Sequence, residues 1–152
     1  MAVTTRIATP DDAEALMRLI NAAFVVERSF IDVERVRIEE VREFQQRGVF
    51  LVAGEMDACV YVEVRGDRGY FGLLSVDPAR QGSGLGRAMV DAAEQYCRDR
   101  GCRWMDLRVV SVREELPPFY RKLGYSESGS EPFESEYPTK VPVHLVKMAK
   151  PL

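Results

Sequence analysis

Hydrophobic and polar positions follow two different spacings along the chain. Apolar residues three or four positions apart, typical of amphipathic helices, occur over residues 13–24, 32–47, 84–100 and 116–123. Runs rich in β-branched and aromatic residues, typical of strands, occur over residues 3–7, 49–53, 58–64, 70–76, 104–110 and 141–148, and a further strand begins at 125–127. Short turns join the three strands between 49 and 76, which predicts an antiparallel meander.

Residues that start and stop helices support these boundaries. Thr9 is followed by Pro10 and two aspartates, which is typical of the start of a first helix. Gly48 is expected to end the second helix in a left-handed conformation, and Gly101 to end the third. Residues 128–140, rich in Ser, Pro and Glu, are predicted to form a loop.

Composition limits the classes of function. The 152 residues are expected to form one domain over 1–152, and the net charge of −3 disfavours nucleic-acid binding. Three cysteines without Cys-x-x-Cys spacing and a single histidine, His144, predict neither a metal site nor disulfides. Without a secretory leader or a membrane-spanning run of apolar residues, we expect a cytoplasmic protein with no membrane partner.

A glycine-rich segment, residues 77–87, joins the strand 70–76 to the helix that begins near Gly84. Glycines let successive backbone N–H groups converge, and the first turn of a helix leaves its amides unpaired. Together these features favour binding of a phosphate group. Because Arg80 and Arg87 flank the segment, we predict a phosphorylated cofactor there.

Two other nucleotide-binding motifs do not fit. A dinucleotide fingerprint, Gly-x-Gly-x-x-Gly, fails because Arg87 or Met89 stands at its last position, depending on whether Gly82 or Gly84 comes first. A P-loop requires Lys followed by Ser or Thr, whereas Arg87 and an alanine follow the last glycine. Hydrolysis of nucleoside triphosphates is therefore disfavoured.

The segment Gln81-Gly82-Ser83-Gly84-Leu85-Gly86 resembles Gln/Arg-x-x-Gly-x-Gly/Ala, the acetyl-CoA-binding signature of the GNAT superfamily of N-acetyltransferases. A second segment, PFYRKLGY at 118–125, resembles the Tyr-x-Lys-x-Gly-Phe/Tyr stretch of that family. The resemblance implies an α/β (α+β) fold. Its central sheet would be mixed, mostly antiparallel and splayed after the fourth strand, with about four flanking helices.

The resemblance also implies roles for individual residues. The pyrophosphate of acetyl-CoA would be bound by Gln81, Gly82, Gly84, Gly86 and Arg87, with Arg80 as a charge partner. Backbone groups of Leu74 and Val76 would hold the pantetheine arm, and Tyr120 would be the general acid. An alternative role for Tyr120 is that of an aromatic core residue beside Phe119.

The general base has several candidates. Asp106 lies on the strand after the cofactor helix, although an ion pair with Arg108 is an equal alternative. His144 has a suitable intrinsic pKa, but a lone histidine in an apolar run is more often structural. Weaker options are Glu34 and Glu63, and deprotonation through water needs none of them.

The acceptor is predicted from charge alone. Carboxylates gather near the expected entry of the acceptor and would attract a cationic amine. The alternative is that they only keep a loop solvated, because salt screens charges that are far apart. These residues are Glu27, Asp32, Glu34, Glu127, Glu131, Glu134 and Glu136. The resemblance implies direct transfer of an acetyl group to a primary amine of a small molecule in a ternary complex, without metal. Residues 141–148 could pair two copies into a homodimer, but an apolar final strand is equally expected inside the sheet of a monomer.

One departure from the family leaves alternatives open. Ser111 and its neighbours occupy the region where many members carry a cofactor-binding asparagine. The chain could therefore be a non-catalytic acyl-CoA sensor or regulatory domain, or it could transfer another acyl group.

Overall fold

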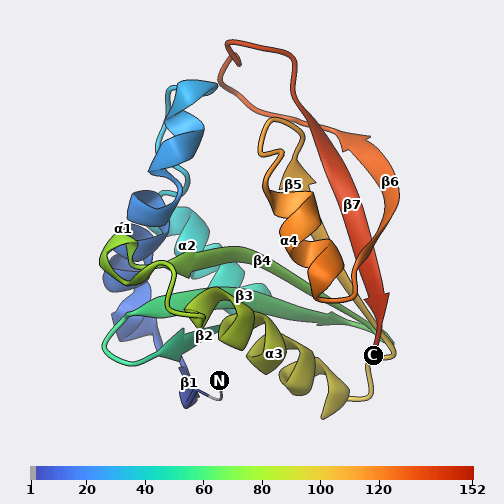
Figure 1. Cartoon of the computed structure of the whole chain (residues 1–152). Coiled ribbons are helices and arrows are strands. Elements are labelled where there is room, and N and C mark those ends of the chain that lie inside the picture. Colours follow the sequence, from blue (N-terminus) through green and yellow to red (C-terminus); the bar gives the residue numbers. More distant parts are fainter. Residues whose placement is uncertain (1–2) are drawn as a thin grey trace.

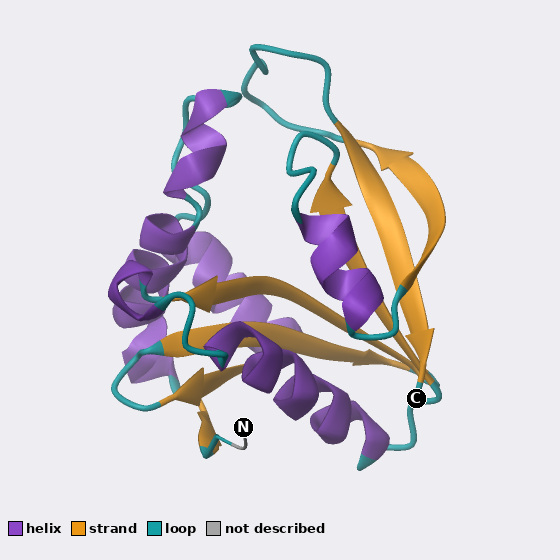
Figure 2. Ribbon diagram, in the orientation of Figure 1, coloured by secondary structure: helices purple, strands orange, loops and turns teal. Residues whose placement is uncertain are grey.

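The computed structural model describes residues 3–152 as one seven-stranded sheet between two layers of helices (Figures 1 and 2). The strands, in the order β1-β2-β3-β4-β5-β7-β6, are β1 (Thr5–Ile7), β2 (Val49–Ala53), β3 (Ala58–Arg65), β4 (Arg68–Val76), β5 (Trp104–Val110), β6 (Ser126–Pro132) and β7 (His144–Pro151). The α-helices are α1 (Ala13–Ala23), α2 (Ile38–Arg47), α3 (Leu85–Arg98) and α4 (Leu116–Lys122). Short 3₁₀ helices are η1 (Pro10–Asp12), η2 (Val25–Ser29) and η3 (Pro78–Arg80).

The sheet splits between β4 and β5. These neighbours are parallel and pair only at one end, where residues 68–70 face residues 104–106, whereas the other neighbouring strands are antiparallel. Beyond Tyr70 the two strands diverge, and Figure 1 shows β5, β7 and α4 turning away from the β1–β4 half. The predicted splay after the fourth strand is confirmed.

Both faces of the β1–β4 half are covered, which explains the continuous apolar run of β2. Leu51 and Ala53 pack with residues of α3 in one buried cluster. Phe50 and Val52 pack with α1 and α2 in another. Phe50 is fully buried, and removing such a side chain from water contributes roughly 1.5–3 kcal/mol.

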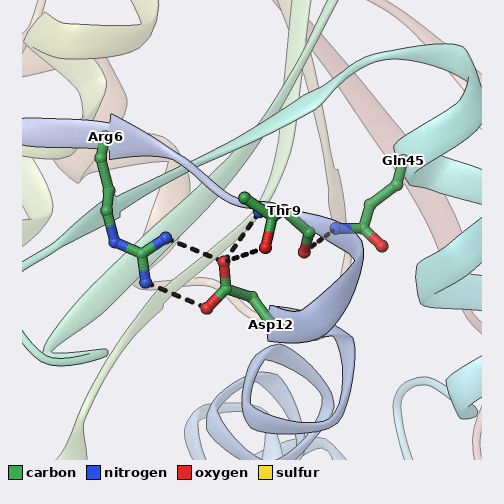
Figure 3. A network of polar contacts seen from close by, with 4 residues as sticks. All are labelled: Arg6, Thr9, Asp12 and Gln45. Atoms are coloured by element: carbon green, nitrogen blue, oxygen red, sulfur yellow. Dashed lines mark hydrogen bonds and ion pairs between the residues drawn. The ribbon is translucent and has the colours of Figure 1, made fainter.

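A polar network holds the start of the first helical segment (Figure 3). Arg6 donates to both carboxylate oxygens of Asp12 at 2.8 and 3.0 Å, and the backbone N–H of Thr9 donates to Asp12 Oδ2 at 2.7 Å. Gln45 of α2 donates to the Thr9 carbonyl at 2.9 Å. The hydrogen bonds from Arg6 and Thr9 lower the pKa of Asp12 to about 2. The predicted start signal thus also ties β1 to α2.

The second helix begins later than predicted. It starts at Ile38, and the preceding residues Phe30, Ile31 and Val36 are buried in non-helical chain. Gly48 is not left-handed, because its φ is −157°. A Cβ at this position would lie 2.4 Å from the carbonyl oxygen of Val62, so the glycine is required by close packing on β3.

The predicted loop over 128–140 is partly wrong, because β6 extends to Pro132 along the edge of the sheet. The side chains of β6 are mostly exposed, so the strand lacks an apolar alternation that sequence reasoning could detect. The final strand begins at His144 instead of 141.

The two halves of the sheet meet again beyond the split. Ile31, just after η2, forms a β-bridge with Thr139 of the β6–β7 loop, and the N–H of Lys140 donates to the carbonyl of Phe30 at 2.7 Å. Figure 1 shows this contact at the top of the molecule. Phe30 and Ile31 also pack against Val110 at the end of β5.

The three cysteines are buried free thiols, and burial raises the pKa of Cys59 to about 12. Within residues 3–152, no group of three or more His, Cys, Asp or Glu side chains is placed to hold a metal ion. None of the helices in this described part has the length and apolar character needed to cross a membrane.

Candidate active site

The glycine-rich segment forms an open turn at the N-terminus of α3. Gly82 and Gly84 have φ values of +82° and +85°, a left-handed conformation that glycine adopts without strain. A Cβ on Gly82 would have no atom within 4 Å, so one side of the turn is open. Because Gly84 caps α3 and leaves its first amides unpaired, the turn fits the phosphate group that the sequence predicts.

Side chains stabilise this turn from within. Asp77 accepts from the N–H of Ala79 at 2.9 Å, and Ser83 Oγ donates to the carbonyl of Arg80 at 2.5 Å. The Arg80 guanidinium forms an ion pair with Asp57 of the β2–β3 turn at 2.9 Å. Arg87, in the first turn of α3, is exposed. Both flanking arginines are thus exposed, and Arg80 is also held to the scaffold by its ion pair.

A β-bulge in β4 sets the direction of the residues that precede this turn. Val60 of β3 faces both Leu73 and Leu74, and Leu73 has a φ of +52°. As a result, Leu73 packs on the α1–α2 side while Leu74 and Val76 pack on the α3 side. Beyond Tyr70, the edge of β4 that faces β5 has no paired strand, which leaves its backbone groups available to a ligand.

Sequence reasoning missed the bulge. The available signal was Gly72, because a glycine inside a strand often marks a bulge or a close approach. Here a Cβ on Gly72 would lie 2.7 Å from the Tyr70 hydroxyl.

Tyr120 of α4 is a buried core residue, as the alternative interpretation predicted. Its ring contacts those of Phe71, Phe119 and Tyr125, with centroids 5.9, 5.0 and 6.0 Å away. Burial raises the pKa of the Tyr120 hydroxyl, while the positive charge of Arg113 acts in the opposite direction. The phenol is therefore protonated at neutral pH, as a general acid must be.

Asp106 lies at the paired end of the sheet. Arg68 of β4 donates to both of its carboxylate oxygens at 2.8 and 2.7 Å. The alternative ion pair between Asp106 and Arg108 is wrong, because Arg108 pairs with Glu131 of β6 at 3.3 Å.

His144 lies at the opposite end of the β5–β7 ladder from Asp106, and its side chain is exposed. The structure does not bring these two candidate bases together. The backbone N–H of His144 donates to Ser111 Oγ at 3.0 Å, and the N–H of Ser111 donates to the His144 carbonyl at 2.8 Å. Ser111 thus pairs with the beginning of β7 through both its backbone and its side chain.

The predicted acidic surroundings are largely neutralised by basic side chains. Arg28 pairs with Asp32 at 2.7 Å and lies 3.9 Å from Glu34. Four arginines and a single glutamate line a groove of about 570 Å³ between α1 and residues 24–37. Glu27 differs from these carboxylates because it is buried.

The sequence model of the family described as acetyltransferase (GNAT) domain matches residues 46–127, more than half of the chain. The chain belongs to the GNAT acetyltransferase family. The matched residues include the meander, the glycine turn, α3, β5 and α4.

Relatives of this GNAT chain include the mycothiol acetyltransferase of Amycolatopsis mediterranei (strain U-32), which is 34% identical in an alignment of 129 residues that covers 76% of this chain and 43% of that protein. A second mycothiol acetyltransferase, from Propionibacterium freudenreichii subsp. shermanii, is 29% identical over 126 residues, 76% of this chain and 40% of that protein. The chain thus spans less than half the length of these curated relatives.

Solved structures share the fold. The ribosomal-protein-S18-alanine N-acetyltransferase from Escherichia coli has a TM-score of 0.77 and 22% identity, over 97% of this chain and 92% of that one. Salmonella typhimurium yncA, solved with its cofactor acetyl-CoA, has a TM-score of 0.75 and 19% identity, over 100% of this chain and 95% of that one.

Proposed function

We propose that this GNAT chain is a cytoplasmic, acetyl-CoA-dependent N-acetyltransferase that acts on a primary amine of a small molecule by direct attack in a ternary complex. The observation that carries the proposal is the arrangement around the split sheet. The glycine turn at the start of α3, the unpaired edge of β4 and the protonated phenol of Tyr120 lie on the α3–α4 side of that split.

The residues present fit acetyl-CoA, which supplies an activated acetyl thioester when bound. Backbone amides of the glycine turn and of Gly86 would bind its pyrophosphate, supported by Arg87. A Cβ on Gly86 would lie 3.9 Å from Phe119 and 4.0 Å from Val76, so α3 begins close to both β4 and α4. Backbone groups of Leu74 and Val76 at the unpaired edge would hold the pantetheine arm.

Two features of the protein favour acyl transfer. A backbone N–H at the bulge would polarise the thioester carbonyl, because the turn of the chain at Leu73 directs main-chain groups away from the β3 ladder. Tyr120 would give its proton to the departing sulfur, since burial keeps the phenol protonated at the pH of the cell.

The names of the curated relatives suggest where the acceptor search should start. They are mycothiol acetyltransferases, and they match three quarters of this chain. A mycothiol-related amine is therefore the first acceptor to test, followed by amino acids, aminoglycosides and short peptides with a free N-terminus.

Two measurements test the proposal. Thermal unfolding with and without CoA and acetyl-CoA reports binding, and release of free thiol in the presence of an amine panel reports transfer. We expect a higher melting temperature with either ligand and thiol release with at least one amine. Stabilisation without thiol release across the panel would support the sensor alternative, and competition among acyl-CoAs would detect a different donor.

A further inference from the structure

Glu27 is a buried carboxylate on the open side of the molecule. It lies in η2, and its side chain is only 10% exposed. Its Oε2 accepts a hydrogen bond from Arg113 Nη1 at 2.9 Å. Because η2 belongs to the α1–α2 half and Arg113 follows β5, this ion pair joins the two halves of the split sheet.

The second oxygen of Glu27 is free to bind a ligand. Arg35 Nε forms an ion pair with Oε1 at 4.0 Å, which is beyond hydrogen-bonding distance. Within residues 3–152 no group donates a hydrogen bond to Oε1. In the same residues, every side-chain oxygen that is fully shielded from solvent has a hydrogen-bond partner, so Oε1 is not one of the shielded oxygens. Oε1 therefore keeps access to the surface from an otherwise buried side chain.

The charges around Glu27 suit a proton acceptor. Burial raises the pKa of the Glu27 carboxyl above its usual range, and Glu115 adds to the rise. The guanidinium groups of Arg35 and Arg113 oppose it. Such a carboxylate is a better base than an exposed glutamate but still ionises.

The charge of one arginine, Arg113, acts on both Glu27 and Tyr120. The charge of Arg113 lowers the pKa of both groups against the effect of burial. Tyr120 belongs to α4, which begins three residues after Arg113. The carboxylate that is open at one oxygen and the protonated phenol are thus both close enough to one guanidinium for its charge to act on them.

We infer that Glu27 is a catalytic residue that binds the ammonium group of the acceptor through Oε1 and takes its proton. The inference rests on the proposed acetyl transfer and adds a further candidate base to Asp106 and His144; of these two, Asp106 lies at the paired end of the split, where Arg68 holds both of its oxygens. Arg113 holds the carboxylate in place through Oε2.

Glu27 accepts one proton from the ammonium group, and the neutral nitrogen attacks the thioester carbon. The new C–N bond forms as the C–S bond breaks, the sulfur takes a proton from Tyr120, and the nitrogen loses its second proton to water. Glu27 then releases its proton to water and Tyr120 regains one from water, so a single proton is released per turnover.

The test uses Glu27→Gln, which keeps an oxygen for Arg113 but removes the charge and the basic site. The matched control is Glu14→Gln, which removes the ion-paired, exposed carboxylate of α1. We expect Glu27→Gln to bind acetyl-CoA normally, to lose about 10²–10⁴-fold in kcat/KM for the amine, and to lose the acidic limb of the pH profile. Glu14→Gln should match the wild type in all three.

A second variant covers the case in which Glu27→Gln does not fold. Arg35, whose side chain is 42% exposed, lowers the pKa of Glu27, so Arg35→Gln should shift the acidic limb of kcat/KM to higher pH. A wild-type acidic limb retained by Glu27→Gln, or unmoved by Arg35→Gln, would overturn the inference while acetyl transfer stands. Absence of transfer by the wild type would overturn the proposed function and this inference together.

Discussion

Tyr125 donates its hydroxyl hydrogen to Glu94 Oε2 at 2.7 Å, and both side chains are buried. Lys150 of β7 donates to the two oxygens of the same carboxylate at 3.0 and 3.1 Å. The carboxylate of α3 therefore joins the end of α4 to the last strand. Tyr125 is the last residue of the Tyr-x-Lys-x-Gly-Tyr segment. Its hydrogen bond to Glu94 gives a structural reason for a tyrosine at this position.

The network predicts a stability effect for Tyr125→Phe. The variant leaves one oxygen of the buried Glu94 carboxylate with one partner fewer, which costs about 1.5–3 kcal/mol in the free energy of unfolding. Urea unfolding would measure the loss, with the exposed Tyr137→Phe as a control that leaves the midpoint unchanged. A midpoint for Tyr125→Phe equal to that of the wild type would show that the hydrogen bond contributes nothing.

Tyr120→Phe separates chemistry from cofactor binding. The ring would keep its packing against Phe71 and Phe119, so the melting temperature and the affinity for acetyl-CoA should stay close to those of the wild type. We expect kcat to fall by about 10²–10⁴-fold because the sulfur loses its proton donor. Since burial raises the pKa of this phenol, the wild-type kcat should show no alkaline decline below about pH 10. An unchanged kcat in the variant would remove Tyr120 as the acid.

The bulge at Leu73 predicts different costs for a β-branched and an unbranched apolar substitution. Leu73→Val places a β-branched side chain at a φ of +52°, a conformation that costs about 1–3 kcal/mol, so the variant should be less stable and slower in acetyl transfer. Leu73→Met keeps an unbranched chain in the same buried space and should cost less than about 1.5 kcal/mol. Equal stability and activity of the two variants would argue against a role for this backbone conformation.

Gly84→Val tests the turn at the start of α3. A β-branched residue is strained at a φ of +85°, so the substitution would distort the turn that caps α3. We expect loss of the thermal shift produced by acetyl-CoA. The comparison is Gly101→Val just beyond the other end of the helix, where φ is +86° and an added Cβ meets nothing within 4 Å, so the backbone strain is similar but acetyl-CoA binding should persist. Binding retained by Gly84→Val would contradict the assigned cofactor turn.

The elements with strong local signals were predicted well from sequence. The strands 49–53 and 104–110 agree with the structure at both ends, because each combines β-branched residues with a clear glycine or polar boundary. The second helix was placed too early, since apolar residues near 33 and 36 continue its spacing but pack in irregular chain near η2. The start of β6 was predicted at 125–127, but its continuation to Pro132 was missed because ladder hydrogen bonds to β7 form it without an apolar face.

The candidate site shows a similar division. The glycine turn and Tyr120 carry local motifs, so they were identified from sequence. The partners of Asp106 and Glu27 come from positions far away in sequence, Arg68 and Arg113, and no spacing rule predicts such pairs. Burial decides whether a carboxyl group keeps its ordinary pKa or has a raised one. The burial of Glu27 depends in turn on how the two halves of the sheet meet.

The capping network of Figure 3 predicts how stability depends on pH. Asp12 has its pKa lowered to about 2 by Arg6 and Thr9, so its contribution is complete above the ordinary aspartate pKa of about 3.9 and is lost as the pH falls toward 2. Asp12→Asn should therefore cost about 1 kcal/mol at pH 7, the scale of a helix cap, and progressively less between pH ~4 and ~2. Thermal unfolding across this range would measure the difference, with the neighbouring Asp11→Asn as the control. A difference that stays constant down to pH ~2 would show that the ionised carboxylate is not what stabilises this corner.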